Sequence, residues 1–167
     1  MDQVLTSAVL DAGRFVDPFD CSAALASGED SLRSKIIELE ERMRERPDQI
    51  HIEPVHYIAH GLYAREITIP KGTLLTGKIH LFEHINIISK GDISVLTEAG
   101  VKRIKAPATI ISKPGIKRVG YAHEETVWTT IHACSETDPE KAEKLLVVDT
   151  FEEFNAAIKE SECPLLP

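Results

Sequence analysis

The chain has 167 residues, and 43% of them are hydrophobic, which is enough for one folded domain and excludes a wholly disordered protein. The formal net charge of −8 argues against a protein that binds duplex nucleic acid, because affinity for phosphates comes from clustered Lys and Arg. The charge is uneven, however. Residues 51–132 carry a net charge of +3 and all seven histidines, whereas both ends of the chain are acidic. Function is therefore expected in this middle segment.

Residues 1–50 are predicted to form an arm followed by one amphipathic helix. Residues 1–28 show no clear periodicity. Across residues 30–46 apolar side chains recur at helical spacing, and Pro47 ends the helix because proline has no backbone N–H to continue it. The single apolar stripe predicts that this helix packs against the body of the protein or against a partner subunit.

Residues 51–133 change to short strands separated by turns that contain Gly or Pro. Strands that recur every ~8–12 residues with such turns between them indicate a β-sandwich or a β-barrel. The expected strands cover residues 62–69, 73–81, 84–89, 93–97, 101–105, 108–112, 116–121 and 126–133.

Residues 134–167 are predicted to form a helical extension and a tail. Pro139 is suited to the first turn of a short helix, and residues 145–148 are compatible with one last strand. Thr150 and Glu153 have the spacing of a capping box, which predicts a second helix after Thr150. The tail over residues 161–167 contains two prolines and is expected to be loose.

The two ends of the chain and the cysteines predict a cytoplasmic protein. Met1-Asp2-Gln3 lacks the basic start of a secretory signal, and no segment approaches the ~20 apolar residues of a membrane span. Cys21, Cys134 and Cys163 are widely spaced and form no CxxC pair, so we expect reduced thiols rather than a disulfide framework or a zinc knuckle.

The segment from Gly72 to Gly91 resembles the first motif of the cupin superfamily. In that family the motif reads Gly, five residues, His, one residue, His, three or four residues, Glu, six residues, Gly. Every spacing fits this chain, but Lys78 stands in place of the first His, and His84 stands in place of the Glu; His80 occupies the second position. This segment therefore keeps one of the two motif histidines, gains a second one in place of the Glu, and has a Lys at the first ligand position.

A second segment resembles the second cupin motif, in which a Pro/Gly turn leads into a strand that carries a further ligand. Here the turn is Lys113-Pro114-Gly115, and Lys117 or Arg118 stands where the family has His. Over residues 61–133 the wider pattern is similar to small uncharacterised cupins encoded by tailed bacteriophages. This resemblance implies a mainly β protein, a cupin-like jelly-roll β-barrel with an N-terminal helix and a C-terminal helical extension. It also implies the host cytoplasm as location, and a transition metal or small polar ligand inside the barrel, as in an oxygenase or isomerase.

A metal site would use His80, His84 and a third ligand. Four residues along a straight strand separate two side chains by ~13 Å, so His80 and His84 can share an ion only if the chain bends near Phe82. His132, on the last expected strand, is the best third ligand, and three imidazoles suit Zn, Fe, Mn, Ni or Cu without selecting among them. Two histidines with Glu124 would instead resemble the facial triad of non-haem iron enzymes.

The departures from the motif favour an anionic ligand. Lys78 together with Lys117 or Arg118 would make the interior positive, which suits a carboxylate, a phosphate or a nucleotide. Trp128 and Tyr121 are candidates to stack on a sugar or base, although a single tryptophan is more often a core residue.

Three functions remain open on these grounds. The chain is a metal-binding cupin enzyme, a non-catalytic phage protein that sequesters an anionic metabolite or nucleotide, or a scaffold without a ligand. Open sheet edges and the amphipathic helix predict a homodimer.

Overall fold

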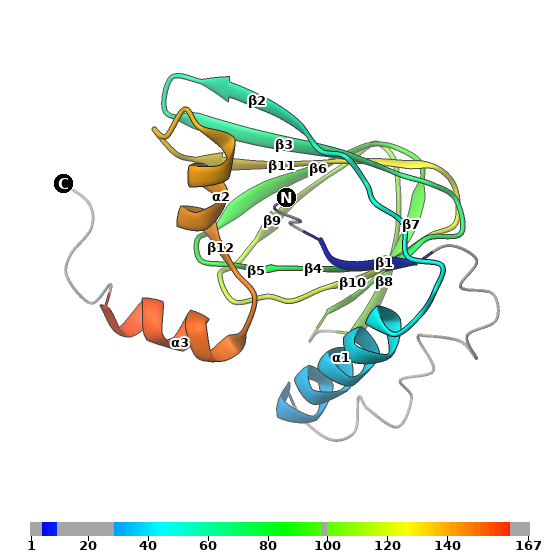
Figure 1. Ribbon diagram of the computed structural model, residues 1–167. Coiled ribbons are helices and arrows are strands. Elements are labelled where there is room, and N and C mark those ends of the chain that lie inside the picture. The colour runs from blue at the N-terminus through cyan, green and yellow to red at the C-terminus, as the bar shows by residue number, and fades with distance from the viewer. Residues whose placement is uncertain (1–4, 10–28, 98–99, 161–167) are drawn as a thin grey trace.

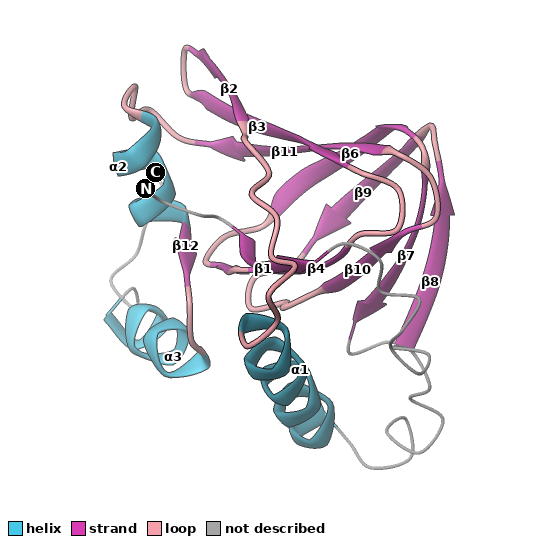
Figure 2. Cartoon of the chain, turned by 45° about the vertical axis from the view of Figure 1, so that its right-hand side comes forward, coloured by secondary structure: helices cyan, strands magenta, loops and turns pink. Residues whose placement is uncertain are grey.

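A computed structural model describes residues 5–9, 29–97 and 100–160, and most of these residues lie in two antiparallel sheets (Figures 1 and 2). The elements in chain order are β1 (Leu5–Val9), α1 (Glu29–Arg44), β2 (Val55–Ala59), β3 (Leu62–Ile69), β4 (Leu74–Gly77), β5 (Ile79–His80), β6 (His84–Lys90), β7 (Asp92–Thr97), β8 (Gly100–Lys105), β9 (Ala108–Ser112), β10 (Val119–Ala122), β11 (Thr126–Ala133), α2 (Pro139–Leu146), β12 (Val147–Val148) and α3 (Phe151–Glu160).

The strand order defines the topology. One sheet runs β1-β4-β10-β7-β8 and the other runs β2-β3-β11-β6-β9. The eight central strands pair in a nested series: β3 pairs with β11, β4 with β10, β6 with β9, and β7 with β8. Nested antiparallel pairing across two facing sheets is the jelly-roll arrangement. The expectation of a barrel or sandwich is therefore confirmed.

The core lies between the two sheets, and strand alternation produces it. Along β3 the side chains of Ile67 and Ile69 are buried, whereas Thr68 between them is exposed. They meet Ile88, Ile93 and other apolar side chains from both sheets. This period of two is the reason that strands with mixed composition can enclose an apolar interior.

One motif glycine is required by the backbone. Gly91 connects β6 and β7 with φ +98, and a Cβ atom there would lie 2.4 Å from the backbone oxygen of Glu125. Only glycine accepts that left-handed conformation without strain, and the close approach excludes any side chain. The glycine that ends the first motif therefore has a structural role.

Helix α1 covers the outer face of the first sheet (Figure 2). Ile36 and Met43 are buried there against Val9, Leu74 and Val119. The predicted apolar stripe is thus covered by the barrel of the same chain, so the helix gives no reason to expect a partner subunit. The helix ends at Arg44, two residues earlier than the sequence predicted.

Residues 5–9 form a strand that the sequence did not predict. β1 pairs with β4 and forms the edge of its sheet, and its five residues are too few to show a periodicity. The rest of the N-terminal arm lies outside the described residues, as do Cys21, Cys163 and the tail over residues 161–167. No helix in the described part of the chain is long and apolar enough to cross a membrane.

The C-terminal extension contains the predicted helices. Asp138 caps α2 by accepting hydrogen bonds from the backbone of Glu140 and Lys141. Thr150 and Glu153 form the predicted reciprocal capping box at α3. The strand expected over residues 73–81 is split, because β5 leaves the barrel sheet and pairs with β12 of the extension.

Candidate functional site

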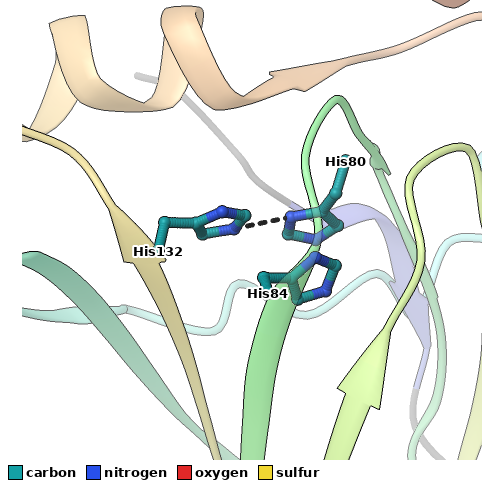
Figure 3. A group of neighbouring side chains, drawn as sticks. All are labelled: His80, His84 and His132. Carbon is teal, nitrogen blue, oxygen red and sulfur yellow. Dashed lines mark hydrogen bonds between the residues drawn. The ribbon is translucent and has the colours of Figure 1, made fainter. Parts of the chain in front are cut away.

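Three histidines converge at one end of the barrel (Figure 3). His80 ends β5, His84 begins β6, and His132 lies near the end of β11. The chain bends between His80 and His84, so their ring centroids lie 4.1 Å apart instead of the ~13 Å of a straight strand. One ligand atom from each ring lies within 4.8 Å of the others. The predicted convergence of these three side chains is confirmed.

Hydrogen bonds orient the three rings. Nδ1 of His80 lies 2.9 Å from Nε2 of His132. Nδ1 of His84 lies 2.9 Å from the carbonyl oxygen of Phe82, so this nitrogen is the donor and Nε2 of His84 carries the lone pair. Fixing one nitrogen by a backbone carbonyl while the other remains available is typical of a metal-binding histidine.

Two nitrogen atoms of the cluster are buried without a partner. Among the described residues, Nε2 of His84 and Nδ1 of His132 make no hydrogen bond. A buried polar atom left unpaired costs about 1–3 kcal/mol, and buried polar atoms are rarely left so in folded proteins. An ion bound beside the facing nitrogens of His80 and His132 would give Nε2 of His84 a partner, whereas Nδ1 of His132 would remain unpaired.

All three imidazoles are held in the neutral state. Burial lowers the pKa of each ring, well below its usual value for His80 and to about 3 for His132. For His80 the neighbouring imidazoles and the guanidinium of Arg118 add to the effect of burial on the pKa. Neutral imidazole is the form that binds metals, so the site is ready for an ion at neutral pH.

The cluster fits one ion with a small adjustment. With metal–nitrogen bonds of ~2.0–2.1 Å, ligand nitrogens lie ~3 Å apart. The His80 and His132 nitrogens are already at 2.9 Å, and the widest separation in the set is 4.8 Å. A movement of about 1–2 Å by one ring would complete the set, which side-chain rotation can supply.

A cavity extends from the cluster into the barrel. About 80 Å³ of it is open to the centres of water molecules, and His80 forms part of its wall. One end carries the charged side chains of Arg65, Lys78 and Arg118. The remaining wall is mostly apolar, and it includes Ile67, Ile69, Leu75, Ile93, Val95 and Trp128.

A hydrogen-bonded group fixes the polar side chains of this cavity. Oδ1 of Asn86 accepts hydrogen bonds from Nε1 of Trp128 and from the hydroxyl of Thr130, each at 2.9 Å. The amide nitrogen of Asn86 donates to Oγ of Ser112 at 2.7 Å. The tryptophan ring is thereby held in the cavity wall, with its N–H already used.

Comparisons with known proteins assign this chain to no family. No protein-family model matches the chain, and no curated protein matches its sequence. Solved structures with a similar backbone include an RmlC-like cupin from Shewanella frigidimarina NCIMB 400, with 14% identity, coverage of 57% of this chain and 93% of that one, and a TM-score of 0.44. A cupin with a double-stranded β-helix fold from Methanocaldococcus jannaschii has 14% identity, coverage of 57% and 89%, and a TM-score of 0.43.

An acetylacetone dioxygenase from Acinetobacter johnsonii is also similar, with 16% identity, coverage of 49% of this chain and 58% of that one, and a TM-score of 0.40. All three scores lie below 0.5, so the fold assignment rests on the nested strand pairing. The fold is a cupin-like jelly-roll β-barrel. What this barrel binds has to be argued from its own residues.

The jelly roll separates the basic residues that the sequence predicted as ligand-binding. Lys78 and Arg118 both line the cavity, and Lys78 also pairs with Asp149 at 3.2 Å. Lys117 points the opposite way and is buried against α1, where its Nζ lies 3.0 Å from Glu40. Of the two residues offered for the second-motif position, the structure places Arg118 at the cavity.

Tyr121 and Glu124 lie away from the cavity of the jelly roll. Tyr121 packs with the residues beneath α1 and meets the ring of His123 edge-on at 4.9 Å. Glu124 precedes β11, whereas His132 lies near the end of that strand, which puts ~26 Å of extended chain between them. The structure therefore does not bring Glu124 to the histidine cluster, and the facial-triad alternative has no support from its position.

Arg65 lines the cavity, although the sequence indicated it only weakly and it was not among the predicted ligand-binding residues. Its Nε lies 3.3 Å from a carboxylate oxygen of Glu143 in α2, and both side chains are buried. Alternation along β3 was a usable signal, since it places Arg65 on the same inward face as Ile67. Glu143 had no comparable signal, because it is one of several acids on a short charged helix.

Proposed function

We propose that this protein binds a divalent transition metal through His80, His84 and His132 and presents it to a small ligand in the barrel cavity. The observation that carries the proposal is the meeting of three neutral, largely buried imidazoles whose ligand atoms lie within 4.8 Å. The unpaired Nε2 of His84 supports it, because a bound ion would give this buried nitrogen the partner that it lacks.

The ligand set suits Zn, Fe, Mn or Ni and does not choose among them. A bound metal would act as a Lewis acid that polarises an oxygen of the ligand. The chain supplies the surroundings: His80 joins the cluster to the cavity, and the apolar wall excludes water from the bound ligand. An oxygenase or an isomerase acting on a small polar substrate is the activity that we propose for this arrangement.

Metal content tests the proposal directly. Protein purified without a His-tag and dialysed against Zn, Fe, Mn or Ni should retain about one ion per chain by mass spectrometry. His84→Ala and His132→Ala should each weaken metal affinity at least ~100-fold, since each removes a ligand. His123→Ala is the matched control, because His123 bonds to Ser94 outside the cluster. A folded wild-type protein that takes up none of the four metals would contradict the proposal.

A second candidate is a non-catalytic protein that captures an anionic metabolite, as the phage resemblance suggested. The observation that favours it is the positive end of the cavity, where Arg118 and Lys78 lie together. The two candidates predict different experimental outcomes. Capture is indicated if metal-free protein binds the ligand and if the ligand is recovered unchanged after incubation with metal-loaded protein. Conversion of the ligand only in the metal-loaded protein indicates an enzyme.

We also propose that two copies pair through the outer face of the sheet β2-β3-β11-β6-β9. One apolar side chain from every strand lies in a single lateral row, consisting of Tyr57, Ala64, Ile131, Ile85 and Ile111. Ile111 is 68% exposed and Tyr57 is 50% exposed. In Figures 1 and 2 no described helix lies over this face.

The area of this face is adequate for a homodimer. Five strands of five to eight residues, spaced by ~4.8 Å, give a face of roughly 24 by 22 Å. Two such faces would bury on the order of 1,000 Å², which is about the smallest area expected of a specific interface. An apolar row that crosses all five strands of a sheet with no helix over it is unusual on a protein that remains a monomer.

A further inference from the structure

The three cations of the cavity differ in how their charge is balanced. Arg65 is paired with Glu143, and Lys78 is paired with Asp149. Arg118 donates from its guanidinium to the hydroxyl of Ser112, but no carboxylate in residues 5–9, 29–97 and 100–160 lies within ion-pair distance of it. Arg118 is therefore the cavity cation whose charge the described part of the chain does not neutralise.

Arg118 lies beside the histidine cluster. Its bonding partner Ser112 is directly opposite His84 in the ladder between β6 and β9. Its charge also lowers the pKa of both His80 and His84, which requires proximity. Burial lowers the pKa of Arg118 itself, as expected for a cation held away from water without a counter-ion. Arg118 is only partly exposed, so leaving its charge without a counter-ion is costly, and an anionic ligand would remove that cost.

The remainder of the cavity offers little to a polar ligand. Its wall is formed largely by aliphatic side chains and the ring of Trp128. The indole N–H is used by Asn86, and the carbonyl oxygen of that amide already accepts two hydrogen bonds. A sugar or a nucleobase would leave its own polar groups unpaired here, which disfavours binding.

The size of the cavity narrows the choice further. A water molecule needs ~10–15 Å³ of space measured at its centre, so the 80 Å³ cavity holds the equivalent of about six waters. That space suits a short aliphatic chain or a single ring and is too small to enclose a nucleotide.

We infer that the cavity binds a small carboxylic acid with an apolar body, whose carboxylate pairs with Arg118 and whose body packs against the aliphatic wall and Trp128. The planar guanidinium matches a carboxylate through two parallel hydrogen bonds, and the largely aliphatic wall offers few partners to the further oxygens that a phosphate would bring. Such an acid would be the ligand in the cavity of the proposed function. The inference rests on that function only because it uses the same cavity, since pairing with Arg118 needs no metal.

Calorimetric titration of the full chain tests this inference with hexanoate, benzoate, hexanol, benzyl alcohol and inorganic phosphate. Both metal-free protein and zinc-loaded protein are titrated. Hexanoate and benzoate should bind at least ~10-fold more tightly than the uncharged alcohols of similar shape and than phosphate. Arg118→Met should lose at least ~10-fold in carboxylate affinity, and Arg118→Lys should recover only part of it, because an ammonium lacks the planar fork.

Lys113→Met is the matched control, since it removes the same charge from an exposed position in the nearby turn. It should leave the carboxylate affinity unchanged, and the thermal melting curves of all variants should show that they fold. Equal binding of hexanoate and hexanol, tighter binding of phosphate than of hexanoate, or unchanged affinity in Arg118→Met would each overturn the inference.

The same titrations separate this inference from the metal proposal. Carboxylate binding that depends on Arg118, in a protein that takes up no metal, would support the inference and contradict the metal proposal. Stoichiometric metal with no carboxylate binding in either state of the protein would do the reverse.

Discussion

His80 and His132 are 52 positions apart in the chain, yet their facing ring nitrogens lie 2.9 Å apart. The pair is assembled by two different parts of the fold. His132 is held by the barrel ladder opposite Tyr63 on β3, whereas His80 pairs with Val147 of the C-terminal extension. The candidate metal centre therefore depends on the extension as well as on the barrel.

This dependence predicts where metal binding changes amide exchange. Adding zinc should slow hydrogen exchange over residues 79–81 and 147–148, because an ion that fixes His80 also fixes the short ladder on which it lies. Helix α1 should be unaffected, since it packs on the outer face of the other sheet. Mass spectrometry of the exchanged protein provides the measurement. Slowing confined to β6 and β11 would show that His80 is not a ligand.

Stability of the metal-free protein should decline in acid. Burial lowers the pKa of His132 from 6.5 to about 3, so between these values the unfolded chain binds more protons than the folded protein. The stabilisation from the neutral ring is complete above pH ~6.5 and falls steadily as the pH drops toward 3. Urea unfolding at pH 7.5 and pH 5 checks this. His132→Asn should reduce the difference between the two pH values, and an unchanged difference would contradict the prediction.

The buried ion pair between Lys117 and Glu40 should be important for stability rather than for binding. Both side chains are almost fully buried, and the pair joins α1 to the segment just before β10. Lys117→Met should lower the free energy of unfolding by up to about 3–5 kcal/mol, because it leaves the buried Glu40 with only the exposed Arg44, 3.7 Å away, as a counter-ion. Adding Glu40→Leu should recover much of the loss. Metal affinity should be unchanged in any variant that folds; a large loss of affinity would show that Lys117 acts at the cavity.

The proposed dimer face makes a prediction about mass in solution. Ile111→Glu places a charge on the most exposed side chain of the apolar row, at its β9 end, and should convert a dimer to a monomer in size-exclusion chromatography with light scattering. Val101→Glu is the matched control, since Val101 is 43% exposed on the other sheet. A wild-type protein that is monomeric at ~100 μM, a concentration well above most specific dimer constants, would contradict the proposed interface.

Much of the fold was predictable because local signals agreed with the tertiary structure. The strands over residues 62–69, 108–112 and 126–133 have the predicted bounds, and the capping box of Thr150 and Glu153 is formed as expected. The short strand at residues 5–9 was not predictable from five residues, because its pairing with β4 is a long-range contact. The same holds for the split of the expected strand at Gly77, which depends on β12 arriving from the C-terminal extension.

The candidate site was predictable in part for a similar reason. The motif spacing and strand alternation identified His80, His84 and His132, because these residues follow regular elements. The sequence could not show whether Lys117 or Arg118 points into the cavity, because both lie in a segment that is not a regular strand. Only the structure shows that Arg118 does. The carboxylate of Glu143 reaches Arg65 from a separate helix, which no local pattern encodes. The phage resemblance and the cytoplasmic location stay predictions.

X-ray absorption spectroscopy of zinc-loaded protein tests the central claim most directly, because it reports the ligands of the ion itself. The three-histidine site predicts about three imidazole nitrogens at ~2.0–2.1 Å from zinc, with the imidazole scattering reduced in His84→Ala. A zinc shell without imidazole, or one that is the same in His84→Ala as in the wild-type protein, would contradict the assignment of His80, His84 and His132 as a metal centre.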